Sequence, residues 1–310
     1  MNQVYQAARI SRQAYYQYNQ RQALFNDRLY ALCIEADMLR EEHPGCGVEK
    51  MYTVLKPDWL GRDRFIEIMM HYGYRLRVHR NYSKTTYPGK AHYPNMIPGM
   101  LLWDKNLLWQ SDITYYRIAD TFYYLIFIID AYTKRILGYS ATDHMRATAN
   151  LTALKMAIAN AGTLTYRLIH HSDRGSQYGE KNYVELLNKY RINISMCKHP
   201  QDNAYAERIN GIIKNEYLKY WDISNLTMLK KKCKQAVNHY NTKRPHLYLP
   251  NKNTPLEFER SLVNLNMIDR HLEIVYSSDK PSSKRPKSEA YLRPYDIADG
   301  SICPIFKSNE

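Results

Sequence analysis

Two aspartates lie in or at the end of apolar stretches, where a buried carboxylate needs a positively charged or hydrogen-bonding partner. Asp112 lies in the apolar and aromatic stretch "WQSDITYY", and Asp173 ends the stretch "LIHHSD". A carboxylate in a central strand is costly to bury unless something pairs with it, and neighbouring carboxylates repel each other. If the two strands are neighbours, a bound divalent cation resolves that conflict. Mg²⁺ takes oxygen ligands and is usually held by one or two carboxylates together with water and substrate phosphate.

A third acid, Glu207, lies in a predicted helix. Asn203, Glu207, Asn210 and Lys214 follow i, i+4, i+7, i+11 spacing, so they share one face of that helix. If this face turns toward the aspartates, Glu207 completes a cation site and Lys214 lies where a phosphate could bind. Taken alone, Glu207 fits a surface salt bridge better.

Other acidic residues compete for the site. Asp130 ends the second predicted strand and Asp143 follows the third, and each fits a turn or cap. They rank below Asp112, because the second strand of a meander directs its end away from the end of the first. His170 and His171 fit packing at the edge of the core, so we do not expect them to bind metal.

The elements that must position these residues change character along the chain. Three β-rich runs come first, and helices and strands then alternate, which predicts a mixed sheet covered by helices. The predicted strands are 107–118, 121–133, 135–144, 166–173 and 191–197, and the predicted helices are 146–162, 180–190 and 202–221.

The N-terminal part, residues 1–82, is predicted to be helical and to bind DNA. It contains a short helix, a turn and a helix that Ser11 could cap, then a helix over roughly 22–42, and then a second helix-turn-helix-like pair. Basic and aromatic residues crowd the second helix of each pair, which favours DNA contact over a bundle that binds nothing. The candidate DNA-binding residues are Arg12, Tyr16, Arg62 and Arg64.

The remaining boundaries follow from composition. Residues 83–105 hold prolines, glycines and lysines and are predicted to be a linker. The catalytic part is expected over 106–260, and residues 261–310 turn polar and basic, which is typical of a solvated tail.

Charge and cysteine usage narrow the function further. The net charge of +14 and the pI of about 9.4 favour a polyanionic partner, with nucleic acid first and an anionic membrane surface second. The five cysteines are scattered and form no C-x-x-C pair, so neither a disulfide framework nor a zinc finger is indicated. With no apolar signal core and no run of membrane-spanning length, we expect a cytoplasmic protein.

The motifs stand in a familiar order. "WQSDITYY", "HHSDRGSQY" and "DNAYAERINGIIKNEYL" resemble the DDE motif of the retroviral-integrase superfamily. "HYNTKRPHLYL" followed by "TPLEF", and the N-terminal "HPGCGVEKMYTVLK", resemble the OrfB-type transposases of insertion sequence family three. The resemblance covers about residues 1–260.

That resemblance implies a ribonuclease H-like catalytic domain with a mixed five-stranded sheet, preceded by an all-α helix-turn-helix region. It makes Asp112, Asp173 and Glu207 the metal-binding and catalytic triad. It implies that Lys214 contacts the transposon end, and that Asn203 and Gln177 lie beside the triad or face DNA. Arg244, in the motif "HYNTKRPHLYL", is a further candidate for DNA binding. Asp173 and Glu207 are 34 positions apart, which is about two fewer than the family's usual spacing. Glu216 is therefore kept as the alternative to Glu207.

The implied function is DNA cleavage and strand transfer with two Mg²⁺ or Mn²⁺ ions per site. The expected partners are the terminal inverted repeats, target DNA, an OrfA protein or fusion, and further copies of the chain in a homo-multimer. Two other functions stay open: a non-catalytic DNA-binding remnant of a transposase, and a nuclease that cuts and never joins.

Overall fold

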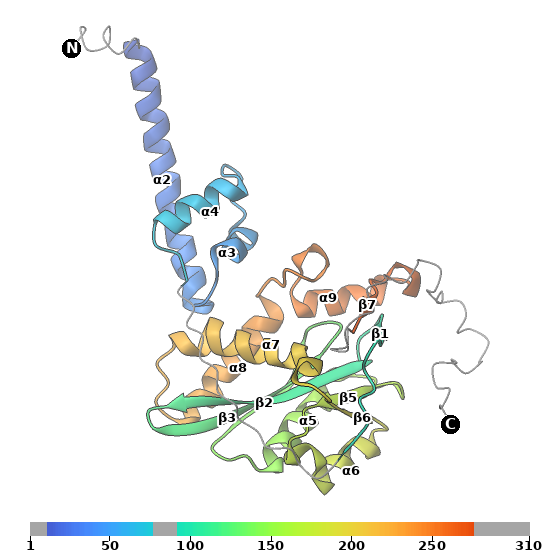
Figure 1. Cartoon of the computed structure of the whole chain (residues 1–310). Coiled ribbons are helices and arrows are strands. Elements are labelled where there is room, and N and C mark those ends of the chain that lie inside the picture. Colours follow the sequence, from blue (N-terminus) through green and yellow to red (C-terminus); the bar gives the residue numbers. More distant parts are fainter. Residues whose placement is uncertain (1–10, 77–91, 276–310) are drawn as a thin grey trace. The chain divides into compact units, whose positions relative to one another are not determined.

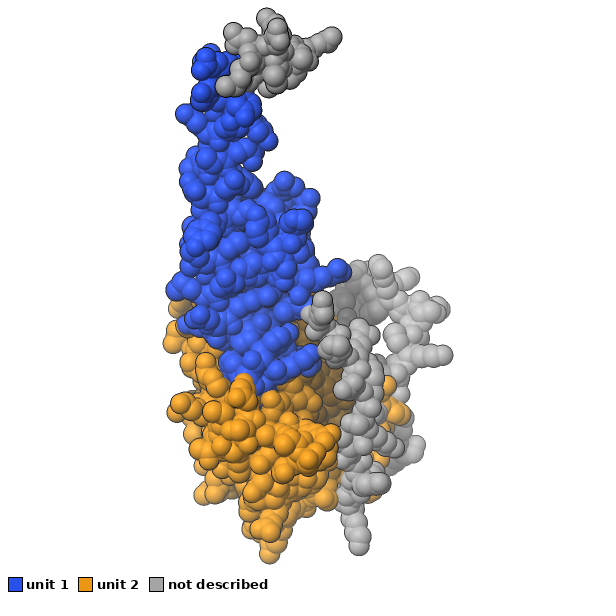
Figure 2. Space-filling model, turned by 90° about the vertical axis from the view of Figure 1, so that its left-hand side faces the viewer, with its two compact units in different colours: residues 1–81, 215–221 blue, residues 82–214, 222–310 orange. Residues whose placement is uncertain are grey.

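The computed structural model describes residues 11–76 and 92–275. The chain divides into two compact units, drawn in two colours in Figure 2. Unit 1 consists of residues 1–81 and 215–221, and unit 2 consists of residues 82–214 and 222–310. A short internal segment of the chain therefore packs with the N-terminal unit.

Unit 2 is built on the expected mixed five-stranded sheet (Figure 1). The strand order is β4-β3-β2-β5-β6, with β2 antiparallel to β3 and parallel to β5. The prediction of a mixed five-stranded sheet covered by helices is confirmed. The strands are β2 Leu108–Ile118, β3 Thr121–Asp130, β4 Ile136–Thr142, β5 Ile169–Ser172 and β6 Asn193–Met196.

Helices cover both faces of this sheet. Trp109 and Ile113 point from β2 into a core shared with α5 and α6, whereas the alternate residues of β2 face α7. Gly162, in the left-handed region with a φ of 73°, ends α5 as expected. The helices of unit 2 are α5 Ala147–Ala161, α6 Lys181–Lys189, α7 Ala204–Ile212, α8 Leu226–Thr242 and α9 Pro255–Ser261.

The helix predicted over 202–221 is not one regular helix. A 3-10 turn, Pro200–Asn203, leads into α7, which passes into a π-helical turn, Ile213–Tyr217, and then a 3-10 turn, Leu218–Tyr220. Further 3-10 turns are Ser176–Gly179, Pro250–Lys252, Leu262–Asn264 and Met267–Asp269. The π turn coincides with the point where the chain passes from unit 2 to unit 1.

Two expected boundaries shift in the structure. Strand β1, Leu101–Leu102, lies inside the stretch predicted to be a linker, and it pairs antiparallel with β7, Glu273–Ile274, inside the stretch predicted to be a tail. Ile97, Leu102 and Val275 are buried in one apolar cluster with Phe258 of α9. The part of the predicted tail beyond residue 275 lies outside the described residues.

Unit 1 is helical, as predicted. Ser11 caps α2, Arg12–Glu42, by accepting a hydrogen bond from the Ala14 amide. The two helices expected over 12–42 are one continuous helix, because no glycine or proline interrupts them. The helix predicted before Ser11 lies outside the described residues. The second pair is present as α3, Val48–Leu55, and α4, Arg62–His71.

The loop that follows α2 binds the segment 215–221 within unit 1. The Gly45 amide donates to the Glu216 carbonyl at 2.6 Å. The Glu216 carboxylate contacts His43 Nε2 at 2.8 Å and Lys50 Nζ at 2.5 Å, and the His43 ring stacks on Tyr217 with centroids 4.7 Å apart. A side chain at Gly45 would meet the Glu216 backbone at 2.3 Å, so only glycine fits there.

We therefore predict that Gly45→Ala lowers the thermal midpoint of unit 1. The added methyl group overpacks against backbone, which costs roughly 1–3 kcal/mol, and each kcal/mol corresponds to about 4–8 °C in a unit of this size. Circular dichroism melting measures the shift. Gly61→Ser is the matched control, because Gly61 is an N-cap with open space around its Cα. Equal midpoints for the two variants would contradict the close packing of this loop.

Candidate active site

The two aspartates meet at one edge of the sheet. In the parallel β2–β5 pair, Ser111 is opposite Ser172, and Asp112 and Asp173 are the next residues of their chains. Neighbouring parallel strands in register direct equivalent residues to the same face. The expectation that these strands are neighbours is confirmed, and it brings the two acids to matching positions.

Alternate residues of β2 attach α7 to the sheet. Gln110 Oε1 accepts from the Tyr205 amide at 3.1 Å and so caps the start of the helix. Asn210 Nδ2 donates to Asp112 Oδ2 at 2.7 Å. Beyond the end of α7, Lys214 Nζ donates to Thr114 Oγ1 at 2.7 Å.

These contacts require the paired residues to be spaced by the same distance along the strand and along the helix. From Gln110 to Thr114 a strand rises about 13 Å, and from Tyr205 to Lys214 a helix also rises about 13 Å. Asn203 adds a further contact by donating to the Ser111 carbonyl at 2.9 Å. The face of the helix predicted from spacing is therefore the face that docks on β2, with Glu207 at its edge.

Burial and neighbouring charge act on Asp112. Desolvation, followed by the charge of Asp173 and a smaller effect of Glu207, raises the pKa of Asp112 to about 7. Its hydrogen bond from Asn210 acts in the opposite direction and only partly compensates. The surroundings of Asp112 therefore favour the protonated form of its carboxyl group.

Asp173 and Glu207 differ in their surroundings. Asp173 Oδ1 accepts from the Gly175 amide at 3.0 Å, while burial raises the pKa of the Asp173 carboxyl. Glu207 is exposed on α7, and partial desolvation raises the pKa of its carboxyl as well. Both acids are close enough to Asp112 to influence its ionisation.

The donors at this edge of the sheet are hard oxygens. Buried Asn203 Oδ1 and Asn210 Oδ1 have no hydrogen-bond partner among the described residues. Carboxylate and amide oxygens are the ligands that Mg²⁺ and Mn²⁺ prefer. Within residues 11–76 and 92–275, however, no three His, Cys, Asp or Glu side chains already converge closely enough to hold a metal ion. The donor chemistry of these oxygens fits a divalent cation.

Other predicted site residues lie close by. Lys214 is half-buried, and desolvation lowers the pKa of its ammonium group while the charge of Asp112 raises it. Gln177 is half-buried in the 3-10 turn that follows Asp173. Both residues therefore adjoin the acidic edge, and their contact with DNA stays a prediction.

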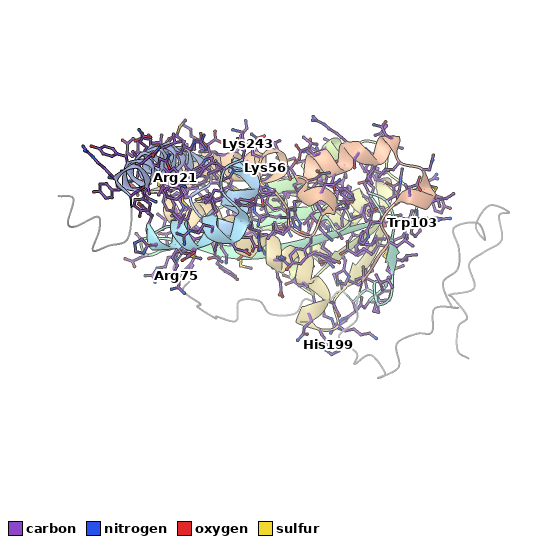
Figure 3. The ribbon with its side chains drawn as sticks, turned by 90° about the horizontal axis from the view of Figure 1, so that it is seen from above. Arg21, Lys56, Arg75, Trp103, His199 and Lys243 are labelled. Atoms are coloured by element: carbon purple, nitrogen blue, oxygen red, sulfur yellow. The ribbon has the colours of Figure 1, made fainter. Side chains whose placement is uncertain are left out.

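The residues expected to contact DNA from unit 1 are exposed. Arg12 lies over the ring of Tyr16, with 5.8 Å between the guanidinium carbon and the ring centroid. Arg62 pairs with Glu49 and Asp63, and Arg64 pairs with Glu67. Exposed ion pairs of this kind contribute little to stability. Further basic residues of the unit, Arg21, Lys56 and Arg75, are labelled in Figure 3.

Arg244 does not fit its predicted contact with DNA. It is buried and lies over the ring of Tyr240, 5.4 Å from the centroid. In the same motif, Asn241 binds the backbone of Ile136 through both its amide oxygen and its amide nitrogen. The "YNTKR" stretch therefore holds α8 against β4.

Asp130, His170 and His171, which were weighed as other candidates for the cation site, stabilise the fold. Buried Asp130 accepts from the amides of Asn106 and Thr133, which makes it the turn residue expected above. His170 binds the Tyr183 hydroxyl, and burial lowers the pKa of His170 to about 3. His171 lies between Ser195 and Cys197, and burial lowers its pKa to about 4. Both imidazoles stay neutral at physiological pH.

The sequence-based predictions missed Gln110. It lies two residues before Asp112, and its side-chain amide accepts from the Tyr205 amide of α7 and donates to the Asp202 carbonyl in the 3-10 turn that leads into α7. The signal was available: a polar residue at i−2 of a strand aspartate shares its face of the sheet.

The chain carries an integrase core. The family model described as "Integrase core domain" matches residues 104–200, and a second model of the same description matches residues 188–255. The first match contains Asp112 and Asp173, and the second contains Glu207 and Lys214.

Relatives in insertion sequences agree. A putative transposase for the element IS986/IS6110 of Mycobacterium tuberculosis is 38% identical over 120 residues, which cover 37% of this chain and 43% of the relative. An uncharacterized 31 kDa protein of the element IS600 of Shigella sonnei is 29% identical over 66% of this chain and 78% of its own length. The transposase InsF of IS3fB from Escherichia coli is 30% identical over 46% of this chain and 51% of its own length. The match thus spans less than half of the mycobacterial relative.

The HTLV-2 integrase catalytic core domain, solved in complex with magnesium, is 23% identical, with a TM-score of 0.42 over 53% of this chain and 99% of that chain. The sequence matches make part of this chain similar to integrase cores. Among the relatives, it is similar to the transposases of the insertion elements IS629, IS150 and IS3fB. In the described part of the chain, no helix is long and apolar enough to cross a membrane.

The electrostatics of Asp112 generate a pH prediction. Its folded pKa of about 7 lies above its ordinary value of 3.8, so its favourable contribution to stability is complete below pH 4 and is lost as pH rises through 7. Asp112→Asn removes this loss. In chelator-treated protein, we expect the variant to melt higher than the wild type at pH 8, by about 4 °C or more, and the difference to shrink toward pH 4.

Thermal melts of both proteins across that pH range measure the difference between their midpoints. In this difference the contributions that other titrating groups make to stability cancel. Asp143→Asn is the control, because Asp143 is an exposed acid of the same unit. A difference that stays constant with pH would contradict the raised pKa of Asp112.

Proposed function

We propose that this chain is a DDE transposase that cuts DNA at the ends of an insertion sequence and joins those ends to target DNA. The observation that carries the proposal is the pairing of Asp112 and Asp173 at matching positions of neighbouring parallel strands, with α7 docked so that Glu207 lies at the same edge. Similarity to integrase cores and to transposases of insertion sequences supports the same reading.

In this proposal, Asp112, Asp173 and Glu207 hold two Mg²⁺ or Mn²⁺ ions. Bound there, the ions would neutralise charge on the phosphodiester and lower the pKa of water or of a 3′-hydroxyl. The raised pKa of Asp112 supports cation binding, because a cation removes the repulsion that favours its protonated form.

The protein's own residues position the reacting groups. Asn210 fixes one oxygen of Asp112, and the Gly175 amide fixes one oxygen of Asp173, so both carboxylates are oriented before DNA binds. Lys214 lies beside Thr114 and supplies a positive charge near the acidic edge, where a DNA phosphate would bind. Such preorganisation supplies most of the catalysis in phosphoryl transfer.

The proposed reaction has two steps. Water attacks a phosphodiester at the element's end, the P–O3′ bond breaks, and a 3′-hydroxyl is freed. That hydroxyl then attacks a phosphodiester of the target and displaces another 3′-oxygen. The second step exchanges one phosphodiester for another, so no ATP is required.

The proposed partners follow from the same function. Unit 1, with exposed Arg12, Tyr16, Arg62 and Arg64, would contact the terminal inverted repeats. Cutting and joining paired ends calls for a homo-multimer, and an OrfA protein or fusion would contribute further end recognition. The protein would act in the bacterial cytoplasm on the nucleoid.

We predict that Glu207→Gln abolishes metal-dependent cleavage, with a loss of at least about 10³-fold, because a metal ligand is removed. Glu216→Gln should retain cleavage, because the Glu216 carboxylate is bound by His43 and Lys50 of unit 1. The assay is nicking and joining of a labelled duplex that carries the element's terminal repeat, with Mg²⁺ or Mn²⁺, with and without OrfA.

Asp143→Asn again serves as the surface control, and Asp173→Asn as the inactive reference. Loss of activity in Glu216→Gln with retention in Glu207→Gln would exchange the roles of the two glutamates. DNA binding without cleavage by the wild type, even with OrfA present, would favour the non-catalytic remnant. Nicked products that are never joined would favour a plain nuclease.

A further inference from the structure

An exposed aromatic side chain stands at the tip of a tight turn in unit 2. The turn lies in the loop that begins at Lys243, labelled in Figure 3, after α8. The Leu249 amide donates to the His246 carbonyl at 3.0 Å, so Leu247 and Tyr248 are the central residues of the turn. Such positions usually carry glycine, proline, asparagine, aspartate or serine. A leucine and a tyrosine there are unusual, and 69% of Tyr248 is exposed.

The turn is rigid on both sides. His246 before it and Leu249 after it are both buried, and the His246 amide donates to the Asn253 carbonyl at 3.1 Å. Leu249 packs in the same apolar cluster as Phe258. The exposure of Tyr248 therefore belongs to a fixed piece of backbone.

Arg208 fixes the ring itself. Its guanidinium carbon lies 4.5 Å from the centroid of the Tyr248 ring, which is the geometry of a cation–π contact. A hydrogen bond from Arg208 also lowers the pKa of the Tyr248 hydroxyl. The arginine covers one side of the ring, and the exposed fraction leaves room for a second flat group.

The pair lies beside the candidate active site. Arg208 directly follows Glu207, and both are exposed on α7 together with Ala204, while Ala206 and Ile209 are buried. The platform formed by Tyr248 and Arg208 therefore belongs to the same open face of the helix as the candidate metal ligand.

We propose that Tyr248, held by Arg208, is a stacking platform for one unpaired base at the DNA end, close to the phosphodiester that is cut. This inference rests on the proposed function, and it names the feature of the substrate that the face of α7 recognises. A paired and stacked base cannot offer its flat face to a side chain, so the base must leave the duplex.

The chemistry favours a nucleobase over other groups. Every base has a π-face, and stacking on an aromatic side chain is worth about 1–3 kcal/mol, which corresponds to about 5- to 150-fold in affinity at 1.4 kcal/mol per factor of ten. Arg208 adds a positive charge for the neighbouring phosphate. A ring that is already immobilised loses little entropy when the base binds.

The test is a thermodynamic cycle between the protein and the DNA. Dissociation constants are measured without divalent metal for the terminal-repeat duplex and for duplexes that carry one abasic nucleotide at successive positions near the end. At one position we expect the abasic site to weaken binding by the wild type at least about fivefold. Tyr248→Ala should weaken binding of the intact end by the same factor and should lose nothing more on that abasic duplex.

The chain offers a matched control. Tyr166 is also at the tip of a hydrogen-bonded turn, 72% exposed, with Arg167 over its ring at 5.5 Å. Tyr166 precedes β5, whereas Asp173 follows β5. The two residues therefore lie at opposite ends of that strand. Tyr166→Ala should leave binding unchanged, and Tyr248→Phe should bind like the wild type because it keeps the ring.

Two results would overturn the inference. In the first, Tyr248→Ala binds the intact end as tightly as the wild type does. In the second, the affinity that Tyr248→Ala loses is the same on the intact end and on every abasic duplex, which would mean that the tyrosine touches only the DNA backbone. Either result leaves the cleavage activity of the wild type intact. Failure of the proposed function would instead appear as the absence of metal-dependent cleavage by the wild type, so the two failures are distinguishable.

Discussion

The candidate site depends on how α7 is attached to β2. One face of the strand presents Gln110, Asp112 and Thr114 at alternate positions, and each is hydrogen-bonded to α7 or to the turn that continues it. A hydrogen bond of this kind contributes only about 0.5–1.5 kcal/mol net, but breaking one leaves a buried polar group unpaired, which costs more. The contacts therefore fix the register of the helix, and register decides where Glu207 lies.

That attachment creates an electrostatic tension. The helix brings the neutral amide of Asn210 to Asp112, while desolvation and the charge of Asp173 raise the pKa of Asp112 to about 7. Nearby His170 and His171 are kept neutral by burial and do not relieve it. Part of the folding free energy thus maintains an arrangement of acids that a divalent cation would stabilise, as is common where a site is built for function.

Much of this arrangement could be predicted from the sequence, because it follows from periodicity. The strand order places Asp112 beside Asp173, and helical spacing places Asn203, Asn210 and Lys214 on one face. The ends of the helices predicted over roughly 22–42 and 146–162 agree with the ends of α2 and α5. These features need only local rules and one strand pairing.

The features that were missed depend on contacts between distant parts of the chain. Gln110 is an ordinary polar residue until α7 is docked on it, and Glu216 resembles a helix residue until the loop at Gly45 binds it. The pairing of β1 with β7 joins two segments whose composition predicts a linker and a tail. Arg244 was predicted to bind DNA, but it is buried and its guanidinium lies over the ring of Tyr240. The composition of a segment indicates whether it favours solvent, but it does not indicate which other part of the chain the segment packs against.

The central claim is that Asp112, Asp173 and Glu207 bind one group of divalent cations. Fe²⁺ can replace Mg²⁺ at an oxygen site and, with ascorbate and peroxide, cuts the nearby backbone. The account predicts cuts near residues 112, 173 and 207, suppressed by excess Mg²⁺ and absent in Asp112→Asn. Cuts elsewhere, or cuts near residue 216 in place of 207, would contradict it.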